Sequence, residues 1–481
     1  MAAPRRGSRS RRWLVLLALI YLLGALSSVA WRGAGQNYAG VARPATELQL
    51  LTDLTGPDAD GERQVQQHIF DAVFALIDQA ESLLVLDLFL FNDFQGAVPE
   101  RQRALAEELT ARLIARKLMT PSLQVLLITD PFNTLYGNQR SPFLERLRAA
   151  GVQVVITDLT KLADSNPSWS WLWRVCCQWL GNDEGGWLPN PVAPGKVTLR
   201  TYLALLNFKA NHRKTVVADR DGDWQAIVMS ANPHNGSSAH SNIGLQFRGP
   251  AALDVLHAEL AVARFSAPEL TLPTAPDPVP AVAAGAGATV QVVTERAIED
   301  AVLRLLRESG AGDAVQLDMF YLSSRAVVQG LLAAHQRGAA LQVLLDPNKD
   351  AFGREKNGIP NRPVAAELHA AGIPVRWCNT LGEQCHSKLV MAQRADGRGE
   401  ALIGSANLTR RNLAGLNLEA DVVLRTPAGD ATFAALQQLF AERWGNTGAI
   451  QYSVDYPVYA DERWWPRVLY RVMEGSGWAS F

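Results

Sequence analysis

Residues 83–89, LLVLDLF, recur in the second half of the chain as residues 314–320, AVQLDMF. Two more stretches recur in the same order, LQVLL (123–127 and 341–345) and LRAAGV or LHAAGI (147–152 and 368–373). The distance between the copies is far longer than the period of a solenoid, so the sequence predicts a duplicated domain.

Each copy alternates short apolar runs, typical of buried strands, with stretches of helical periodicity such as 104–117 and 364–371. This alternation predicts an α/β fold in which a mainly parallel or mixed sheet is flanked by helices. We place the first copy at residues 45–266, the second at 289–450 and a C-terminal tail at 451–481.

Two segments interrupt the repeat. Residues 267–288 are rich in Pro, Ala and Gly and are predicted to link the copies. The stretch from Leu147 to His212 is about 47 residues longer than its counterpart, which predicts an insertion at 159–207. The insertion contains five Trp, and two interpretations stay open: a small satellite core, or a surface that meets lipid.

The composition narrows the class of protein. Of 481 residues, 48% are hydrophobic and 19% are charged, which excludes a disordered chain, and four Cys are too few for a disulfide scaffold. Six of the 46 basic residues lie within residues 1–32, so the remainder has 40 basic against 47 acidic groups, a net charge of −7. That balance argues against nucleic acid as a partner.

The N-terminus carries a membrane signal. An Arg cluster precedes an uncharged run from Trp13 to Trp31, and 19 helical residues span roughly 28 Å, close to a bilayer core. Residues 1–32 are therefore predicted to be an anchor in the inner membrane, with the catalytic part on the translocated side. The alternative is a signal peptide cleaved after Ser28-Val29-Ala30, which would release the protein.

Translocation would expose the cysteines to an oxidising compartment. Cys378 and Cys385 could then close a small loop, whereas the adjacent Cys176 and Cys177 are predicted to pair elsewhere or stay free.

A His-x-Lys triplet occurs twice, at His212–Lys214 and at His386–Lys388. With eight His and eight Lys in the chain, random placement would give about 0.13 such triplets. Each triplet is followed by an apolar run and then by Ser-Ala-Asn, which ends at Asn232 in the first copy and at Asn407 in the second. Both sets lie at equivalent points of the repeat.

The residue types suit phosphodiester chemistry. His and Lys two positions apart lie on one face of a strand, so two facing copies would surround one pocket with two His, two Lys and two Asn. The Lys and Asn side chains would bind the phosphate oxygens, one imidazole would attack phosphorus, and the other would protonate the leaving alkoxide. No cofactor and no metal site is predicted.

These motifs resemble the signature of the phospholipase D superfamily, His-x-Lys-(four residues)-Asp followed by Gly-Ser-x-Asn. The first copy fits from His212 to Asp219 but has Met229 in place of Gly, and the second has Gln393 in place of Asp. The resemblance implies two such domains related by a pseudo-twofold axis and a phosphohistidine intermediate. It also implies that Ser230 and Ser405 contact the substrate.

The same resemblance predicts an acid that orients a catalytic histidine. Counting from the Ser-Ala-Asn motifs, Glu419 is at that position in the second copy and Gly244 in the first. Each copy thus keeps one expected carboxylate, Asp219 or Glu419, while Asp87 and Asp318 are possible replacements.

The family analogy makes His212 the nucleophile and His386 the acid. Glu419 is predicted to raise the basicity of His386. The reverse assignment of the two histidines stays open.

Three functional hypotheses follow. The first is a membrane-associated enzyme that acts on phospholipids, resembling cardiolipin synthases if the acceptor is an alcohol and phospholipase D if it is water. The second is a nuclease of the same superfamily. The third is a non-catalytic binding protein. The predicted partners are a phospholipid substrate, the membrane and an alcohol or water acceptor, with no protein partner.

Overall fold

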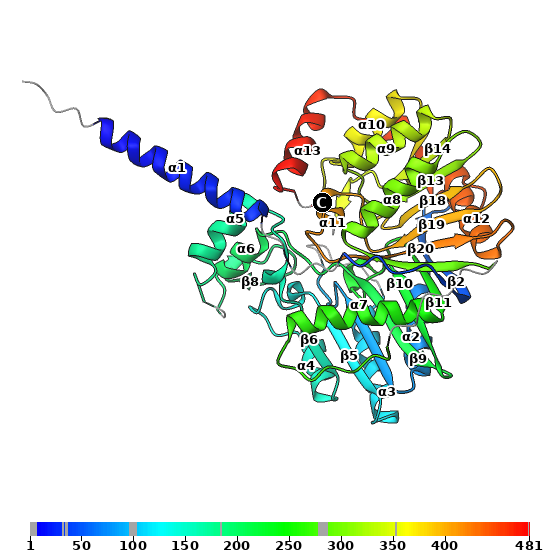
Figure 1. The fold of residues 1–481 in the computed structure, drawn as a ribbon, viewed down its shortest axis with the longest axis horizontal. Helices are drawn as coiled ribbons and strands as arrows, with labels where there is room; N and C mark the ends of the chain where they lie inside the picture. The colour runs from blue at the N-terminus through cyan, green and yellow to red at the C-terminus, as the bar shows by residue number, and fades with distance from the viewer. Residues whose placement is uncertain are drawn as a thin grey trace, which may run out of the picture.

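The computed structural model describes residues 7–30, 33, 37–95, 103–182, 185–277, 287–351, 354–479 and 481. Two large sheets dominate it, one in each half of the chain (Figure 1). The first runs in the order β3 (Arg63–Gln67), β2 (Thr46–Pro57), β11 (Asn242–Arg248), β10 (Asp223–Met229), β9 (Lys214–Arg220), β4 (Leu83–Leu88), β5 (Gln124–Thr129) and β6 (Gln153–Ile156).

The second sheet runs in the order β1 (Arg43–Pro44), β12 (Thr289–Thr294), β20 (Ala420–Thr426), β19 (Gly399–Gly404), β18 (Lys388–Gln393), β13 (Ala314–Met319), β14 (Ala340–Leu345), β17 (Val375–Cys378) and β21 (Ser453–Asp455). Two small two-stranded sheets pair β7 (Leu188–Pro189) with β8 (Lys196–Val197) and β15 (Asp350–Ala351) with β16 (Arg354–Glu355).

Both large sheets are mixed, and they share one plan. In the first, β4, β5 and β6 are parallel, and β9, β10 and β11 continue the sheet as antiparallel neighbours. In the second, β13, β14 and β17 are parallel, followed by β18, β19 and β20. The recurring stretches 83–89 and 314–320 contain the central strands β4 and β13, so the predicted duplicated α/β fold is confirmed.

Helices cover the outer face of each sheet. The first sheet is covered by α2 (Ile69–Gln79), α3 (Leu105–Met119) and α4 (Pro142–Ala149). The second is covered by α8 (Arg296–Glu308), α9 (Arg325–Gln336) and α10 (Asn361–Ala370). The inner faces share one apolar core, to which α7 (Pro250–Ser266) and α12 (Ala431–Gly445) contribute, so the two halves bury a common surface.

The segment 159–207 forms a small helical layer of its own. It contains η2 (Leu159–Lys161), α5 (Pro167–Leu172), a π-helical turn η3 (Trp173–Cys177) and α6 (Leu199–Leu205), together with β7 and β8. Residues 278–286 of the predicted linker lie outside the described residues, and the described part from Ala267 to Asp277 has neither helix nor strand.

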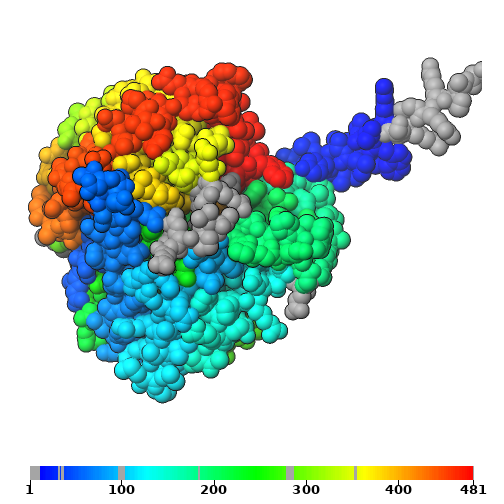
Figure 2. Space-filling model, turned by 180° about the vertical axis from the view of Figure 1, so that it is seen from behind, coloured from blue at the N-terminus to red at the C-terminus, as the bar shows by residue number. Residues whose placement is uncertain are grey.

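The N-terminal helix α1 (Gly7–Ala30) projects from the body, with α5 packed against its end (Figure 1). Among the described residues, Arg11–Ala30 is the one helix long and apolar enough to cross a membrane, with mean hydropathy 2.3 and 6% of the apolar stretch buried. The end of the predicted anchor at 31–32 lies outside the described residues. Figure 2 shows the C-terminal segment and the insertion meeting at the base of α1.

All four cysteines form disulfides. Cys378 pairs with Cys385, which closes the predicted small loop. Cys176 pairs with its neighbour Cys177, so the expectation that these two pair elsewhere or stay free is wrong. Both residues lie in the π-helical turn η3.

Candidate active site

The two motif histidines line one cavity of about 270 Å³ between the halves. Each lies just before an antiparallel strand, His212 before β9 and His386 before β18. The backbone N–H of His212 donates to the carbonyl of Leu418 at 2.8 Å, and that of His386 donates to Ser241 at 2.8 Å. Each histidine is therefore fixed by hydrogen bonds to the opposite half of the molecule.

The imidazole partners also come from the opposite half. His212 Nδ1 lies 2.9 Å from Glu419 Oε2, and His386 Nδ1 lies 3.0 Å from Asn242 Oδ1. Glu419 was expected to raise the basicity of His386, and that expectation is wrong because Glu419 contacts His212. Both partners accept from Nδ1, so Nε2 of each ring is left for the reacting atoms.

In the structure, the counterpart of Glu419 in the first half is Asn242, not Gly244. Ser241 pairs with the residue before His386, and Leu418 pairs with the residue before His212. The interval from Asn407 to Glu419 is two residues longer than the interval from Asn232 to Asn242. Counting along the chain from the Ser-Ala-Asn motifs therefore misses Asn242 as a site residue.

Ser230 and Ser405 are placed behind the histidine partners rather than at the cavity. Ser230 Oγ donates to Asn242 Oδ1 at 3.1 Å, and Ser405 Oγ donates to Glu419 Oε2 at 2.5 Å. Both serines are fully buried. The expectation that they contact substrate is corrected. Their hydroxyls donate to Asn242 and Glu419, the side chains that orient the two imidazoles.

The substitution of Met229 for the expected glycine has a packing explanation. Met229 lies opposite Gly244, whereas its counterpart Gly404 lies opposite Asp421. A Cβ atom on Gly244 would come within 2.9 Å of Met229 Cβ, and one on Gly404 would collide with the Asp421 carboxylate. In each half a small residue thus accommodates a larger one on the next strand.

The two lysines occupy matching positions. Lys214 Nζ donates to the His212 carbonyl at 2.5 Å and lies 4.9 Å from the centre of the Phe89 ring. Lys388 Nζ donates to the His386 carbonyl at 2.9 Å and lies 5.2 Å from the centre of the Phe320 ring. The same phenyl rings contact the imidazoles, with centroids 4.8 Å apart for Phe89 and His212 and 5.0 Å for Phe320 and His386.

Further polar groups complete the cavity wall. Asn232 and Asn407 both line it, and Asn232 Oδ1 accepts from Leu90 N at 3.3 Å. His240 also lines it, with its ring 5.9 Å from that of His386. Arg411, a residue that the motifs do not contain, adds a cation whose pKa is lowered to about 10 by burial. The only sequence signal for it is its position four residues after Asn407.

The cavity is electrostatically suited to an anion. Burial lowers the pKa of Lys214 to about 7 and also lowers that of Lys388. Burial, followed by the charges of these lysines, lowers the pKa of both His212 and His386 well below the usual range. A bound phosphodiester anion would offset this repulsion and favour protonation at the site.

Asp219, predicted to be catalytic, lies at the far end of β9. Its carboxylate accepts from the backbone N–H groups of Ser82 at 2.9 Å and Leu83 at 2.8 Å, where β4 begins. In the second half, where Gln393 replaces the motif Asp, Asp313 accepts from Ala395 N at 2.9 Å. The catalytic role expected of Asp219 is corrected to a structural one.

We expect Asp219→Ala to lower the free energy of unfolding by about 1 kcal/mol, because partly exposed backbone donors lose their acceptor. The turnover of the folded variant should remain within about twofold of the wild type. Denaturant unfolding and steady-state kinetics on the same preparation would measure both. A large loss of turnover with unchanged stability would return Asp219 to the catalytic residues.

Asp87 and Asp318 do not reach the histidines either. Asp87 accepts from Asn211 Nδ2 at 2.8 Å, close to a buried cluster in which Arg213 pairs with Glu259 at 3.0 Å. Asp318 instead pairs with Arg443 of α12. Both carboxylates thus belong to buried networks behind the cavity, and their suggested role as replacement orienting groups is wrong.

Comparison with known proteins identifies similar domains and folds. A family model described as the phospholipase D-like domain of cardiolipin synthase matches residues 302–444. No curated protein matches the sequence closely enough to count as a relative. A phosphatidylserine synthase from Haemophilus influenzae Rd KW20 is structurally similar, with 11% identity and a TM-score of 0.54, over 94% of this chain and 96% of that one.

Two more distant structures also match. Polyphosphate kinase from Porphyromonas gingivalis has 14% identity and a TM-score of 0.47, covering 89% of this chain but 53% of its own, so this chain spans about half its length. Nuc from Salmonella typhimurium, a phospholipase D family member, has 19% identity and a TM-score of 0.27, over 35% of this chain and 98% of its own.

The chain as a whole has a fold similar to that of the phosphatidylserine synthase, and residues 302–444 match a phospholipase D-like domain of the cardiolipin synthase type.

Proposed function

We propose that the protein is a membrane-associated phosphatidyltransferase of the phospholipase D type, which acts on phospholipids through a phosphohistidine intermediate. The observation that carries the proposal is the cavity itself, where the histidines of the two His-x-Lys pairs meet and the two imidazoles have unlike partners, Glu419 and Asn242. The similarity of residues 302–444 to a cardiolipin synthase domain supports a phospholipid as substrate.

The unlike partners support one assignment of the histidine roles. His212 Nε2 attacks phosphorus, and the positive charge that develops on its ring is stabilised by the Glu419 carboxylate. As the bond from phosphorus to the leaving oxygen breaks, protonated His386 gives its proton to that oxygen. His386 has a neutral partner in Asn242, so it releases the proton more readily than an imidazolium paired with a carboxylate would.

The second step reverses the first with a new alcohol. His386, now neutral, takes the proton of the acceptor hydroxyl, whose oxygen attacks phosphorus and breaks the bond to His212. Lys214, Lys388 and the two motif asparagines bind the phosphate oxygens throughout. An alcohol acceptor gives transfer, and water gives hydrolysis by the same residues.

Membrane association is supported by apolar surface on three segments. α1 is an apolar helix with little burial, and the insertion exposes Trp179 and Trp187. The C-terminal helix α13 (Trp464–Ser476) exposes Trp464, Trp465, Val468 and Val472. Trp478, just after α13, donates from Nε1 to Ser168 Oγ of the insertion at 2.7 Å, so these segments adjoin. Aromatic side chains of this kind favour the membrane interface.

The test is reconstitution of the full chain in vesicles of phosphatidylglycerol and phosphatidylethanolamine, with products read by mass. We expect diphosphatidylglycerol with release of glycerol, and reversal when glycerol is added. Phosphatidic acid as the main product would establish the hydrolase instead. Release of nucleotides from DNA without lipid turnover would establish the nuclease, and no turnover of either substrate would contradict an enzymatic role.

A second prediction concerns pH. Asn242→Asp gives His386 a carboxylate partner, which raises the pKa of its imidazolium, so the alkaline limb of the pH–activity profile should move upward by about one unit. Asn242→Ala is the matched control, because it removes the acceptor without adding charge. It should lower turnover and leave the alkaline limb near or below its original pH. Equal shifts in both variants would argue that His386 is not the acid.

A further inference from the structure

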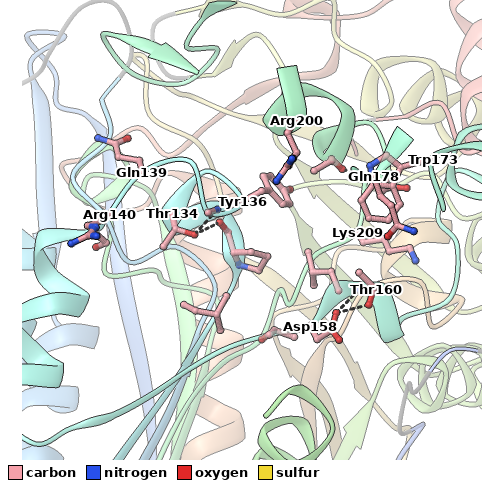
Figure 3. Close-up of a pocket in the computed structure, with 18 of the residues that line it drawn as sticks. Thr134, Tyr136, Gln139, Arg140, Asp158, Thr160, Trp173, Gln178, Arg200 and Lys209 are labelled. Carbon is pink, nitrogen blue, oxygen red and sulfur yellow. Dashed lines mark hydrogen bonds between the residues drawn. The ribbon is translucent and has the colours of Figure 1, made fainter. Parts of the chain in front are cut away.

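A second cavity, of about 530 Å³, lies beneath the insertion (Figure 3). It opens at the carboxyl ends of β5 and β6, the edge of a parallel sheet where ligands commonly bind. Pro131, Tyr136 and Ile156 line it from the sheet side, and Trp173 and Ala204 line it from the insertion. Figure 3 shows Gln139 and Arg140 at one end and Trp173, Gln178 and Lys209 at the other.

The wall of this cavity leaves two polar atoms unpaired. Asn207 Oδ1 and Trp173 Nε1 have no hydrogen-bond partner among the described residues, and Asn207 is only 6% exposed. Asn207 Nδ2 donates to the Ala204 carbonyl at 3.1 Å, which leaves Oδ1 as the atom without a partner. A buried acceptor and a buried donor without partners belong to residues that line this cavity, whose exposed wall is mostly apolar. Together they fit a ligand that has both an apolar body and a polar group.

The insertion connects this cavity with α1. Tyr21 of α1 contacts Trp171 of α5, with ring centroids 5.7 Å apart, and its hydroxyl donates to the Ser168 carbonyl at 3.1 Å. α5 continues directly into the π-helical turn that begins with Trp173. One short stretch of the insertion therefore contacts the predicted anchor and also lines the cavity.

The cavity also adjoins the catalytic site. Asn207 and Lys209 line the second cavity, while Ala210 and His212 line the catalytic one. Thr157, which lines the second cavity, accepts a hydrogen bond from Asn211 Nδ2 at 2.9 Å. Asn211 directly precedes the catalytic His212. The two cavities thus share the segment 207–212 as a common wall.

We propose that this second cavity binds an acyl-ester chain of the phospholipid whose phosphate lies between His212 and His386. This inference rests on the proposed function. The apolar lining and ligand-sized volume fit a hydrocarbon chain, and the indole N–H of Trp173 fits an ester carbonyl. A hydroxyl or water that accompanies the ester donates to Asn207 Oδ1. The acyl chain enters the cavity from the bilayer, on the side of α1.

The variant Ala204→Trp tests the proposal, because it fills the cavity from α6. The matched control is Ala435→Trp, at an exposed alanine of α12 outside both cavities. We expect Ala204→Trp to raise KM for a lipid with sixteen-carbon chains by at least ~10-fold relative to one with six-carbon chains. Cleavage of bis(p-nitrophenyl) phosphate, which has no chain, should be unchanged, and Ala435→Trp should change neither activity.

Two measurements are independent of turnover. Binding of cis-parinaric acid, followed by fluorescence, should be lost in Ala204→Trp and kept in Ala435→Trp. In the wild type, phosphatidylglycerol with a diazirine on its acyl chain should crosslink to the segment from Trp173 to Asn207. Crosslinks confined to other segments, or parinaric acid binding equal in both variants, would overturn the inference.

These readouts keep the two proposals separate. If the wild type cleaves no phosphodiester but crosslinks in the cavity, the proposed function fails and the cavity remains a site for an acyl chain. If the wild type turns over lipids but the crosslinks lie outside the second cavity, the proposed function stands and the proposed acyl-chain site is wrong. Crosslinking by a free diazirine fatty acid that excess phosphatidylglycerol does not displace would assign the cavity to a separate lipid rather than to the substrate.

Discussion

His212→Ala should abolish turnover, with a loss of at least about 10⁴-fold. The variant removes the atom that forms the bond to phosphorus, and residues that act together in covalent catalysis show losses of this size when one is deleted. The measurement is release of p-nitrophenol from phosphatidyl-p-nitrophenol, with rapid quenching to detect the phosphorylated protein. The wild type should carry a label on His212, and the variant should show neither label nor burst.

His386→Ala is the informative counterpart. p-Nitrophenolate leaves without protonation, so this variant should release about one equivalent in a burst and then stall, because the second step lacks its base. The label should accumulate on His212. A stable label on His386 in the wild type, or a burst in His212→Ala, would reverse the roles that Glu419 and Asn242 suggest.

Arg213→Met should lower the free energy of unfolding by about 3–5 kcal/mol, because breaking a buried ion pair leaves uncompensated charge. Arg213 is fully buried, and its guanidinium lies 3.0 Å from Glu259 and 2.6 Å from Glu295. Burial opposes its charge, but Glu295 and Glu259 together raise the pKa of Arg213 above its ordinary value. These acids lie in opposite halves, so the variant should weaken their association. Urea unfolding measures the effect.

Arg220→Met is the matched control. Arg220 ends β9, the strand that follows Arg213, and has partly exposed partners, so this variant should cost less than about 1 kcal/mol. In Arg213→Met the two buried carboxylates lack a cation. Adding Glu259→Gln and Glu295→Gln should restore part of the loss. If Arg213→Met lowers the free energy of unfolding by no more than Arg220→Met does, the stabilising role assigned to Arg213 is wrong.

Much of the fold could be predicted because it depends on patterns of neighbouring residues in the sequence. The recurring apolar runs mark β4 and β13, and the helical periodicity of 104–117 and 364–371 corresponds to α3 and α10. A central strand that is buried on both faces consists mainly of consecutive apolar residues, so it can be recognised in the sequence alone. The His-x-Lys pairs were visible for a related reason, since alternation along a strand places both side chains on one face.

The partners of those pairs were harder to predict. Glu419 was assigned to the wrong histidine, and Asn242 was missed, because the two copies differ by two residues in the loop that follows the Ser-Ala-Asn motif. Asp219 fits a motif letter by letter, yet it binds backbone N–H groups at the start of β4. A motif records which residues recur, whereas a contact between distant segments depends on loop lengths and on how the sheets face each other.

The sequence by itself determined the duplication, the alternating α/β elements, the apolar N-terminal helix and the pairs of His, Lys and Asn. These features depend on the order and spacing of neighbouring residues, which the chain carries directly. Only the tertiary structure decided that each histidine takes its partner from the opposite half, and that the insertion covers a second cavity beside the first. Both result from packing two sheets on a shared core, where residues more than a hundred positions apart come within hydrogen-bond distance.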